Sequence, residues 1–388
     1  MATCGRSWLV AVALAGTWPA TGIAKAERLA FVSSEADGKV VVVDLDTEKV
    51  TGTLPVGKVP HAMAIGRGGA IFVSNRGSKE LTVIDGRTAK VVATIPLPAT
   101  SFQLAASPDG KLLAVAYKDA LELSIVDVST RAISSTVTLG NLPAGDFKGS
   151  MMRHPYWSPD GKFVYVPDDV NKVVVKVDVA RAQVARVIDV GAVTHHLLPS
   201  PDGKLLYAVN EKRGSGTSVT LIDAATDAVV QDLPVALAPD ETALGHHGAF
   251  TRDGRHFLFC NEGGHHVSVL DVGKRTWVKT IETGQGPGHA ALSPDGRFFF
   301  VVHHHDRVVT VIEAVKLEAV KNITIADKGE QSHAAWFTPD GRFFYVVSGD
   351  NALVKVDVAS GQVSSRVGVG PRSFFFVVRD GEDFPLTE

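Results

Sequence analysis

Histidine is the residue whose placement in this chain most clearly suggests chemistry. The chain contains 14 histidines, and eight of them precede a recurring tight turn such as Pro294-Asp295-Gly296. Counted back from the first residue of each turn, they stand five residues before it (His154, His196, His247, His289) or six residues before it (His61, His195, His246, His333). A repeated element that carries histidine at one repeat position predicts that the imidazoles gather at one place.

Two further histidine groups, His265-His266 and His303-His304-His305, each follow a run rich in aromatic and β-branched residues. Imidazoles crowded together repel one another when protonated and have depressed pKa values when buried, whereas the neutral form is a ligand of zinc, copper, iron and nickel. We therefore predict a transition-metal site, with cofactor contacts from His195, His246 and His304. The predicted metal ligands are His61, His154, His196, His247, His289, His333, His265, His266, His303 and His305.

The sulfur-containing residues favour copper over zinc or iron. Met63, Met151 and Met152 all lie within three residues of His61 or His154, and thioether ligands select copper among the first-row metals. Cys260 precedes His265-His266 and offers either a thiolate ligand or, more commonly for a lone cysteine, buried packing. Carboxylates that could orient the imidazoles from behind are Asp240, Glu241, Glu262, Asp306 and Glu330.

The elements that position these histidines repeat along the chain. Eight turn signals follow one another at intervals of 40 to 51 residues, beginning at Arg67, Pro108, Pro159, Pro201, Arg252, Pro294, Pro339 and Arg379. Each is followed by a β-branched or aromatic run, a polar loop, a run that ends in aspartate, and a fourth short strand. This pattern is typical of an all-β propeller with four-stranded blades.

Eight turn signals predict eight blades, and the alternative is seven blades with a stray strand. The first repeat lacks its leading strand, and Ser373–Val378 form a surplus strand at the other end. Pairing the two closes the ring and removes exposed sheet edges. Loops after the second strands then return to the face from which the histidine-bearing strands start, so the histidines are expected at one mouth of a central channel. Residues 27–388 are predicted to form this single domain.

Composition and termini narrow the setting. The net charge of −3 and the lack of a basic stripe argue against nucleic acid as a partner. Residues 1–26 resemble a signal peptide, with an apolar run from Trp8 to Gly16 and a small-residue cleavage site at Ala24-Lys25-Ala26. We expect export to the periplasm or beyond, no membrane span after cleavage, and one thiol, Cys260, in the mature chain.

Paired segments such as Ile71–Asn75 with Leu81–Asp85, and Leu206–Asn210 with Val219–Asp223, resemble exported YVTN-type β-propellers. Those are similar in fold to the eight-bladed haem domain of cytochrome cd1 nitrite reductase. The literal Tyr-Val-Thr-Asn string is absent, and no Cys-x-x-Cys-His motif is present for covalent haem. The resemblance implies the fold, while function depends on the site.

Three functions remain open at this point. The first is a propeller that binds a transition metal, for metal handling or metal-dependent redox chemistry with a periplasmic redox or metal-delivery partner. Nitrous-oxide reductase offers an analogy, since it also places histidines at the centre of a propeller. The second is a propeller that binds haem or another tetrapyrrole, with Arg76, Lys118, Lys212, Arg213 and Arg307 available to anionic groups. The third is a protein-interaction scaffold without a cofactor, whose histidines would turn into blade contacts.

Overall fold

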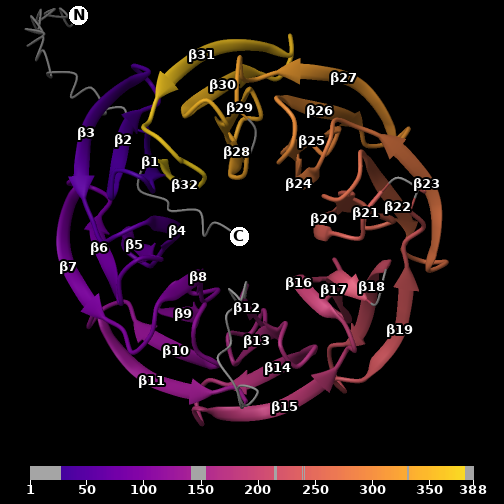
Figure 1. Ribbon diagram of the computed structural model, residues 1–388, viewed down its shortest axis with the longest axis horizontal. Coiled ribbons are helices and arrows are strands. Elements are labelled where there is room, and N and C mark those ends of the chain that lie inside the picture. The colour runs from indigo at the N-terminus through magenta and orange to yellow at the C-terminus, as the bar shows by residue number, and fades with distance from the viewer. Residues whose placement is uncertain are drawn as a thin grey trace, which may run out of the picture.

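The ring of blades is complete in the computed structural model, which describes residues 28–140, 154–213, 216–237, 239, 241–329 and 332–380. Their regular structure consists of eight antiparallel four-stranded sheets arranged as blades around a central axis (Figure 1). The predicted eight-bladed propeller is confirmed, and the seven-blade alternative is wrong. The predicted signal peptide lies outside the described residues, which hold no helix long and apolar enough to cross a membrane.

Each blade runs from an innermost strand at the axis to an outermost strand at the rim (Figure 1). In that order, blades 1 to 4 consist of β32 (Phe376–Asp380), β1 (Arg28–Ser34), β2 (Lys39–Asp44) and β3 (Lys49–Pro55); β4 (Pro60–Ile65), β5 (Ala70–Asn75), β6 (Glu80–Asp85) and β7 (Lys90–Pro96); β8 (Ser101–Ala106), β9 (Leu112–Tyr117), β10 (Glu122–Asp127) and β11 (Ala132–Thr138); and β12 (Tyr156–Trp157), β13 (Phe163–Asp168), β14 (Val173–Asp178) and β15 (Gln183–Asp189). Blades 5 to 8 consist of β16 (Val193–Pro199), β17 (Leu205–Arg213), β18 (Gly216–Asp223) and β19 (Val229–Pro234); β20 (Gly245–Phe250), β21 (His256–Asn261), β22 (His266–Asp271) and β23 (Thr276–Glu282); β24 (Pro287–Leu292), β25 (Phe298–His303), β26 (Val308–Glu313) and β27 (Glu318–Thr324); and β28 (Ala335–Phe337), β29 (Phe343–Ser348), β30 (Ala352–Asp357) and β31 (Gln362–Gly368).

The C-terminal strand closes the ring as predicted. β32 pairs antiparallel with β1, placing Leu29 opposite Arg379 and Phe31 opposite Val377. The strand begins at Phe376, three residues later than the predicted Ser373, although the Phe375 carbonyl still accepts a hydrogen bond of 2.9 Å from Ser33 N. Phe374 and Phe375 precede the strand, and their rings lie 5.2 Å from His333 and 4.6 Å from His61 respectively.

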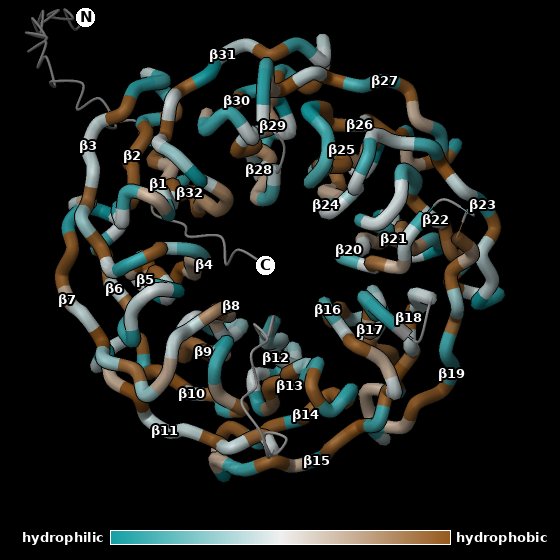
Figure 2. Tube along the Cα trace, viewed as in Figure 1, coloured by the Kyte–Doolittle hydropathy of each residue, from teal (hydrophilic) through white to brown (hydrophobic). Residues whose placement is uncertain are grey.

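The middle strands of each blade are buried on both faces because neighbouring blades pack against them. β5 and β25 are almost wholly buried, whereas the outermost β7 and β27 are mostly exposed. Figure 2 shows this as hydrophobic stretches recurring inside every blade. Fully burying a valine, isoleucine or phenylalanine side chain contributes about 1.5–3 kcal/mol to stability. Contacts between neighbouring blades therefore hold the ring together.

The recurring turn is stabilised by its own side chains. Ser293 Oγ donates to Asp295 Oδ1 over 2.7 Å and accepts a hydrogen bond of 3.0 Å from Phe298 N. Gly296 has φ of +74°, a conformation that glycine adopts without strain. Ser or Thr stands at the same point before other turns, including Ser107 and Thr338. The turn ends the innermost strand on one face, so the strand's other end lies on the opposite face.

Candidate metal centre

A closed circle of aromatic side chains surrounds the axis on the face opposite these turns. Successive ring centroids lie between 4.0 and 6.3 Å apart all the way round. We call this the axial circle, and its members are His61, Phe102, His154, His195, His246, His289, His333 and Phe375. His196 and His247 contact it from adjacent positions, with their own rings 4.2 Å apart. The predicted convergence of strand-start histidines is therefore present in the fold.

Breaks in strand register direct these side chains toward the axis. In five blades the pairing of the innermost strand with its neighbour is interrupted at the histidine position or its equivalent. Consecutive residues of a regular strand point to opposite faces, and a bulge changes that alternation. His246 and His247 consequently both reach His289, at centroid distances of 4.9 and 4.1 Å. Their shared direction depends on the bulge between Gly245 and Gly248.

One loop histidine, His304, joins the histidines of the strand starts. It follows β25, and its ring lies 4.0 Å from that of His333 and 4.5 Å from that of His246. A Cβ atom at Gly288 would meet His304 Nε2 at 2.4 Å, so glycine is needed there to admit the ring. The eight histidines in mutual contact form what we call the imidazole sector: His154, His195, His196, His246, His247, His289, His304 and His333.

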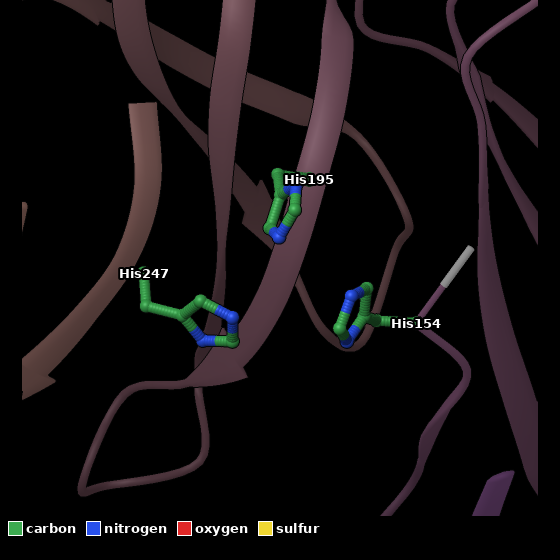
Figure 3. A group of neighbouring side chains, drawn as sticks. All are labelled: His154, His195 and His247. Atoms are coloured by element: carbon green, nitrogen blue, oxygen red, sulfur yellow. The ribbon is translucent and has the colours of Figure 1, made fainter. Parts of the chain in front are cut away.

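Two groups within this sector bring three imidazoles close enough together that they could hold a metal ion. In the first, ligand atoms of His154, His195 and His247 lie within 4.8 Å of one another, and their rings surround a common space (Figure 3). In the second, the same limit holds for His246, His289 and His304. Three imidazoles with an open fourth position form a known arrangement for catalytic zinc, and imidazole also suits copper and iron.

Two imidazoles of the sector are oriented by an acceptor at one ring nitrogen. Glu262 Oε1 lies 2.9 Å from His304 Nδ1, which directs the lone pair of Nε2 into the group. His246 Nδ1 lies 3.2 Å from the Gly288 carbonyl, which can only accept, so this nitrogen donates. Carboxylates and carbonyls orient metal-binding histidines in this manner.

Six buried ring nitrogens of the sector have no hydrogen-bond partner in the structure. They are Nδ1 and Nε2 of His195, Nδ1 of His196, and Nε2 of His247, His289 and His304. Leaving a buried polar group unsatisfied costs about 1–3 kcal/mol. A neutral imidazole carries a lone pair on only one of its ring nitrogens, and a bound cation would accept that lone pair, so the donor set fits a metal.

Burial favours the neutral form of six imidazoles in the sector. Loss of solvation, followed by repulsion from neighbouring imidazoles, holds the pKa of His154, His246, His247, His289 and His333 well below the ordinary value. The same causes lower the pKa of His196 to about 3. Burial is the largest single influence on Glu262 and would raise its pKa, but the hydrogen bond with His304 and the attraction of nearby imidazoles together outweigh burial and lower the pKa of this carboxyl. Neutral imidazoles backed by an ionised carboxylate suit a cation.

The rest of the axial circle has a different composition. His61 stands between Phe102, at 5.2 Å, and Phe375, at 4.6 Å, and we call these three residues the phenylalanine sector. His61 Nδ1 lies 2.6 Å from Oε1 of the buried Glu35, and the Arg76 guanidinium lies 3.6 Å from the same oxygen. His61 was predicted as a metal ligand, but it belongs to neither triad because the two phenylalanines separate it from the other imidazoles.

The other predicted ligands lie outside the triads. His303 is the last residue of β25, and its Nδ1 donates to the Val308 carbonyl over 3.0 Å. His266 Nδ1 pairs with Glu241 Oε1 at 2.6 Å, while the side chains of His265 and His305 are each 46% exposed. Strand alternation and the path of the loop explain these positions. Of the three histidines at the end of β25, only His304 is turned toward the axis.

The sulfur groups give copper less support than predicted. Cys260 is buried in an apolar cluster, and burial raises the pKa of its thiol to about 12. Met63 is buried among apolar residues of blades 1 and 2. Met151 and Met152 lie outside the described residues, as do the predicted carboxylates Asp240 and Glu330. Asp306 accepts hydrogen bonds from the backbone of Arg307 and Gln285.

Two carboxylates behind the histidines were missed in the sequence. Glu35 pairs with His61, and Glu211 Oε2 lies 3.8 Å from His195 Nδ1. Glu35, Glu211, Glu262 and His304 share one repeat position, directly after the second-strand residues Ser34, Asn210, Asn261 and His303. Aligning the repeats at that position would have identified them.

Comparisons with known proteins agree with the fold. The model of the family described as "Lactonase, 7-bladed beta-propeller" matches residues 155–376. The structure described as "Dihydro-heme d1 dehydrogenase NirN in complex with DHE" is similar with a TM-score of 0.74 and 20% identity, covering 90% of this chain and 74% of that one. Kuenenia stuttgartiensis hydrazine synthase is similar with a TM-score of 0.60 and 20% identity, covering 77% and 96%.

These identities establish likeness of fold alone. The likeness to NirN confirms, at that level, the resemblance drawn from the sequence to eight-bladed propellers of the cytochrome cd1 type. No curated protein sequence matches the chain. The chemistry of the site therefore has to be inferred from its own residues.

Proposed function

Since the chain belongs to the seven-bladed lactonase-type β-propeller family yet closes eight blades around a circle of histidines, we propose that it binds transition-metal ions at the axis. The two sites are the triads His154–His195–His247 and His246–His289–His304. The observation that carries the proposal is the set of six buried ring nitrogens without partners. Four of the five histidines concerned belong to the triads, and a metal ion there would accept one lone pair from each, which reduces the cost of burying these nitrogens.

Copper remains the favoured ion, with zinc as its main competitor. The affinity of nitrogen sites for divalent first-row metals peaks at copper, and neutral imidazoles suit both ions. The support comes from the imidazoles rather than from sulfur, because Cys260 is enclosed by apolar side chains. With three protein ligands each, the sites keep positions open for a substrate or for a metal-delivery partner in the periplasm.

A haem-type tetrapyrrole is the second candidate. The likeness to NirN, whose description names a haem d1 substrate, favours it. So do the guanidinium groups of Arg76 and Arg372, which lie beside Glu35 and could pair with propionates. The third idea, a scaffold without cofactor, requires histidines turned into blade contacts, and the two triads do not fit that arrangement.

Metal titration with a visible spectrum tests the proposal. The metal-free protein should bind about two equivalents of Cu(II), measured by elemental analysis after desalting, and should show weak d–d absorption without a haem band. Zn(II) should compete for the same two equivalents. Failure to retain either ion would overturn the proposal, and a strong haem band in the protein as purified would favour the tetrapyrrole.

A further inference from the structure

A second group of imidazoles and carboxylates lines a pocket beside the imidazole sector. The pocket has a volume of about 310 Å³ and lies between blades 6 and 7, on the face of the axial circle. Its walls come from the segments before β20 and β24 and from the loops after β21 and β25. The side chains that matter are Glu241, Glu262, His265 and His305.

These side chains form two imidazole–carboxylate pairs. His265 Nδ1 lies 3.7 Å from Glu241 Oε1, and His305 Nε2 lies 3.4 Å from Glu262 Oε1. Both imidazoles are 46% exposed, so water and dissolved ions can reach them. Among the described residues that line the pocket there is no lysine or arginine. The composition therefore suits a cation.

Glycines allow these groups to lie against the backbone. A Cβ atom at Gly264 would meet Glu241 Oε1 at 2.2 Å, and one at Gly286 would meet His305 Cδ2 at 2.5 Å. Gly286 also has φ of +65°, which most other residues would adopt only with strain. The wall is thus shaped around the two side chains that could bind a metal.

Glu262 connects this pocket to the second triad. Its Oε1 lies 2.9 Å from His304 Nδ1 as well as 3.4 Å from His305 Nε2, and its Oε2 lies 3.7 Å from His246 Nε2. One carboxylate therefore touches an exposed imidazole on one side and two buried imidazoles of the triad on the other. Glu262 is therefore the carboxylate that lies between the pocket and the second triad.

The charge distribution makes this side the favoured approach for a cation. Arg76 and Arg372 flank Glu35 next to the phenylalanine sector, whereas the pocket carries two carboxylates. Clefts lined by charge of one sign concentrate ions of the opposite sign and raise their association rate. A divalent cation should therefore reach the pocket before it reaches the axis.

We propose that this pocket is a loading site, at which His265, His305, Glu241 and Glu262 bind a divalent metal ion weakly and pass it to His246–His289–His304. The inference rests on the proposed function, because it needs a metal centre at the axis. Weak binding follows from the geometry, since the ligand atoms of the pocket do not form one of the compact triads. The loading site should speed filling of the axis without changing its final occupancy.

Loading kinetics of the His265→Ala/His305→Ala double variant test this proposal with Cu(II) alone as the probe. Metal-free protein is mixed with less than one equivalent of Cu(II), and absorbance of the axial site is followed by stopped flow. The variant should load at least tenfold more slowly than wild type and reach the same final occupancy. In equilibrium titration, wild type should show one additional weak equivalent that the variant lacks.

His256→Ala is the matched control. His256 begins β21, whose other end leads to Glu262, so it lies on the same blade but at the opposite face. This variant should load like wild type, and circular dichroism with thermal melting should show that both variants fold.

The outcomes separate the two proposals. If wild type binds copper at the axis and the double variant loads equally fast, the loading site is overturned and the proposed function stands. If the double variant loses axial occupancy altogether, His265 and His305 are ligands of the centre itself and the loading role is wrong. If wild type retains no copper at all, the proposed function has failed, and the loading site with it.

Discussion

The two sectors lie on the same face of the propeller, and the histidines at their strand starts share a repeat position, yet their chemical environments differ. In the phenylalanine sector, His61 has a buried ionic partner 2.6 Å away and aromatic neighbours on both sides. In the imidazole sector, five histidines carry ring nitrogens with no partner in the structure. The difference teaches that a histidine at the repeat position becomes a candidate ligand only where its neighbours are also histidines, whereas His61 pairs with Glu35 and lies between two phenylalanines.

The largest expected effect is loss of metal from single triads. His154→Ala should remove about one of two bound copper ions, because it leaves the first triad with two imidazoles. His289→Ala should remove the other ion, and the double variant should retain almost none, as measured by elemental analysis after desalting.

His61→Ala is the control from the other sector and should keep both ions. If it loses metal as the triad variants do, the division of the circle into two sectors is wrong for metal binding.

Removing a carboxylate should cost more stability in the phenylalanine sector, at Glu35, than in the imidazole sector, at Glu262. Glu35→Ala should lower the free energy of unfolding by about 1.5–3 kcal/mol, because hydrogen bonds to charged groups are worth that much and His61 and Arg76 lose their shared partner. Urea denaturation of the metal-free protein measures it.

Glu262→Ala should destabilise the metal-free protein less, since Glu262 is 16% exposed whereas Glu35 is 1% exposed, but it should weaken copper retention. Equal effects of the two substitutions on both properties would argue against separate roles.

Acid should destabilise the metal-free protein through the imidazole sector. In the unfolded chain, histidine binds a proton below about pH 6.5. In the folded chain, burial lowers the histidine pKa, to about 3 for His196, so protonation favours the unfolded state. The stability that these buried neutral histidines contribute is therefore fully present above pH 6.5 and is lost progressively as the pH falls below that value.

Each such histidine contributes up to about 1.4 kcal/mol per pH unit. The urea midpoint of unfolding should be much lower at pH 5.5 than at pH 7.5 for the wild type, and this difference should be smaller for His196→Phe. An unchanged midpoint between these pH values would contradict the burial of neutral imidazoles.

The smallest effect is expected at the thiol. Because the pKa of Cys260 is raised to about 12 by burial, it should not react with a disulfide reagent at pH 8 until the protein is unfolded. The measurement uses a Cys4→Ser background so that one thiol is counted. Cys260→Ala should retain copper like wild type, and a loss of metal would restore sulfur to the ligand set.

Much of the fold could be predicted because its signals are local and repeated. Turns such as Pro294-Asp295-Gly296 fix the start of each second strand through their own side chains, and the buried runs that follow match strands packed on both faces. The closing strand was expected from the leftover ends, although it begins at Phe376 rather than at the predicted Ser373. For the site, the predicted face and most of the converging histidines agree with the structure.

The sequence by itself determined the blade, the number of blades and the presence of histidine at one repeat position, because each depends on residues near one another in the chain. Only the tertiary structure decided which histidines meet. Register breaks turn His246 and His247 together toward the axis, Gly288 admits His304, and Phe102 and Phe375 isolate His61. These outcomes depend on contacts between blades that are distant in sequence, and the spacing of histidines along one chain does not encode them.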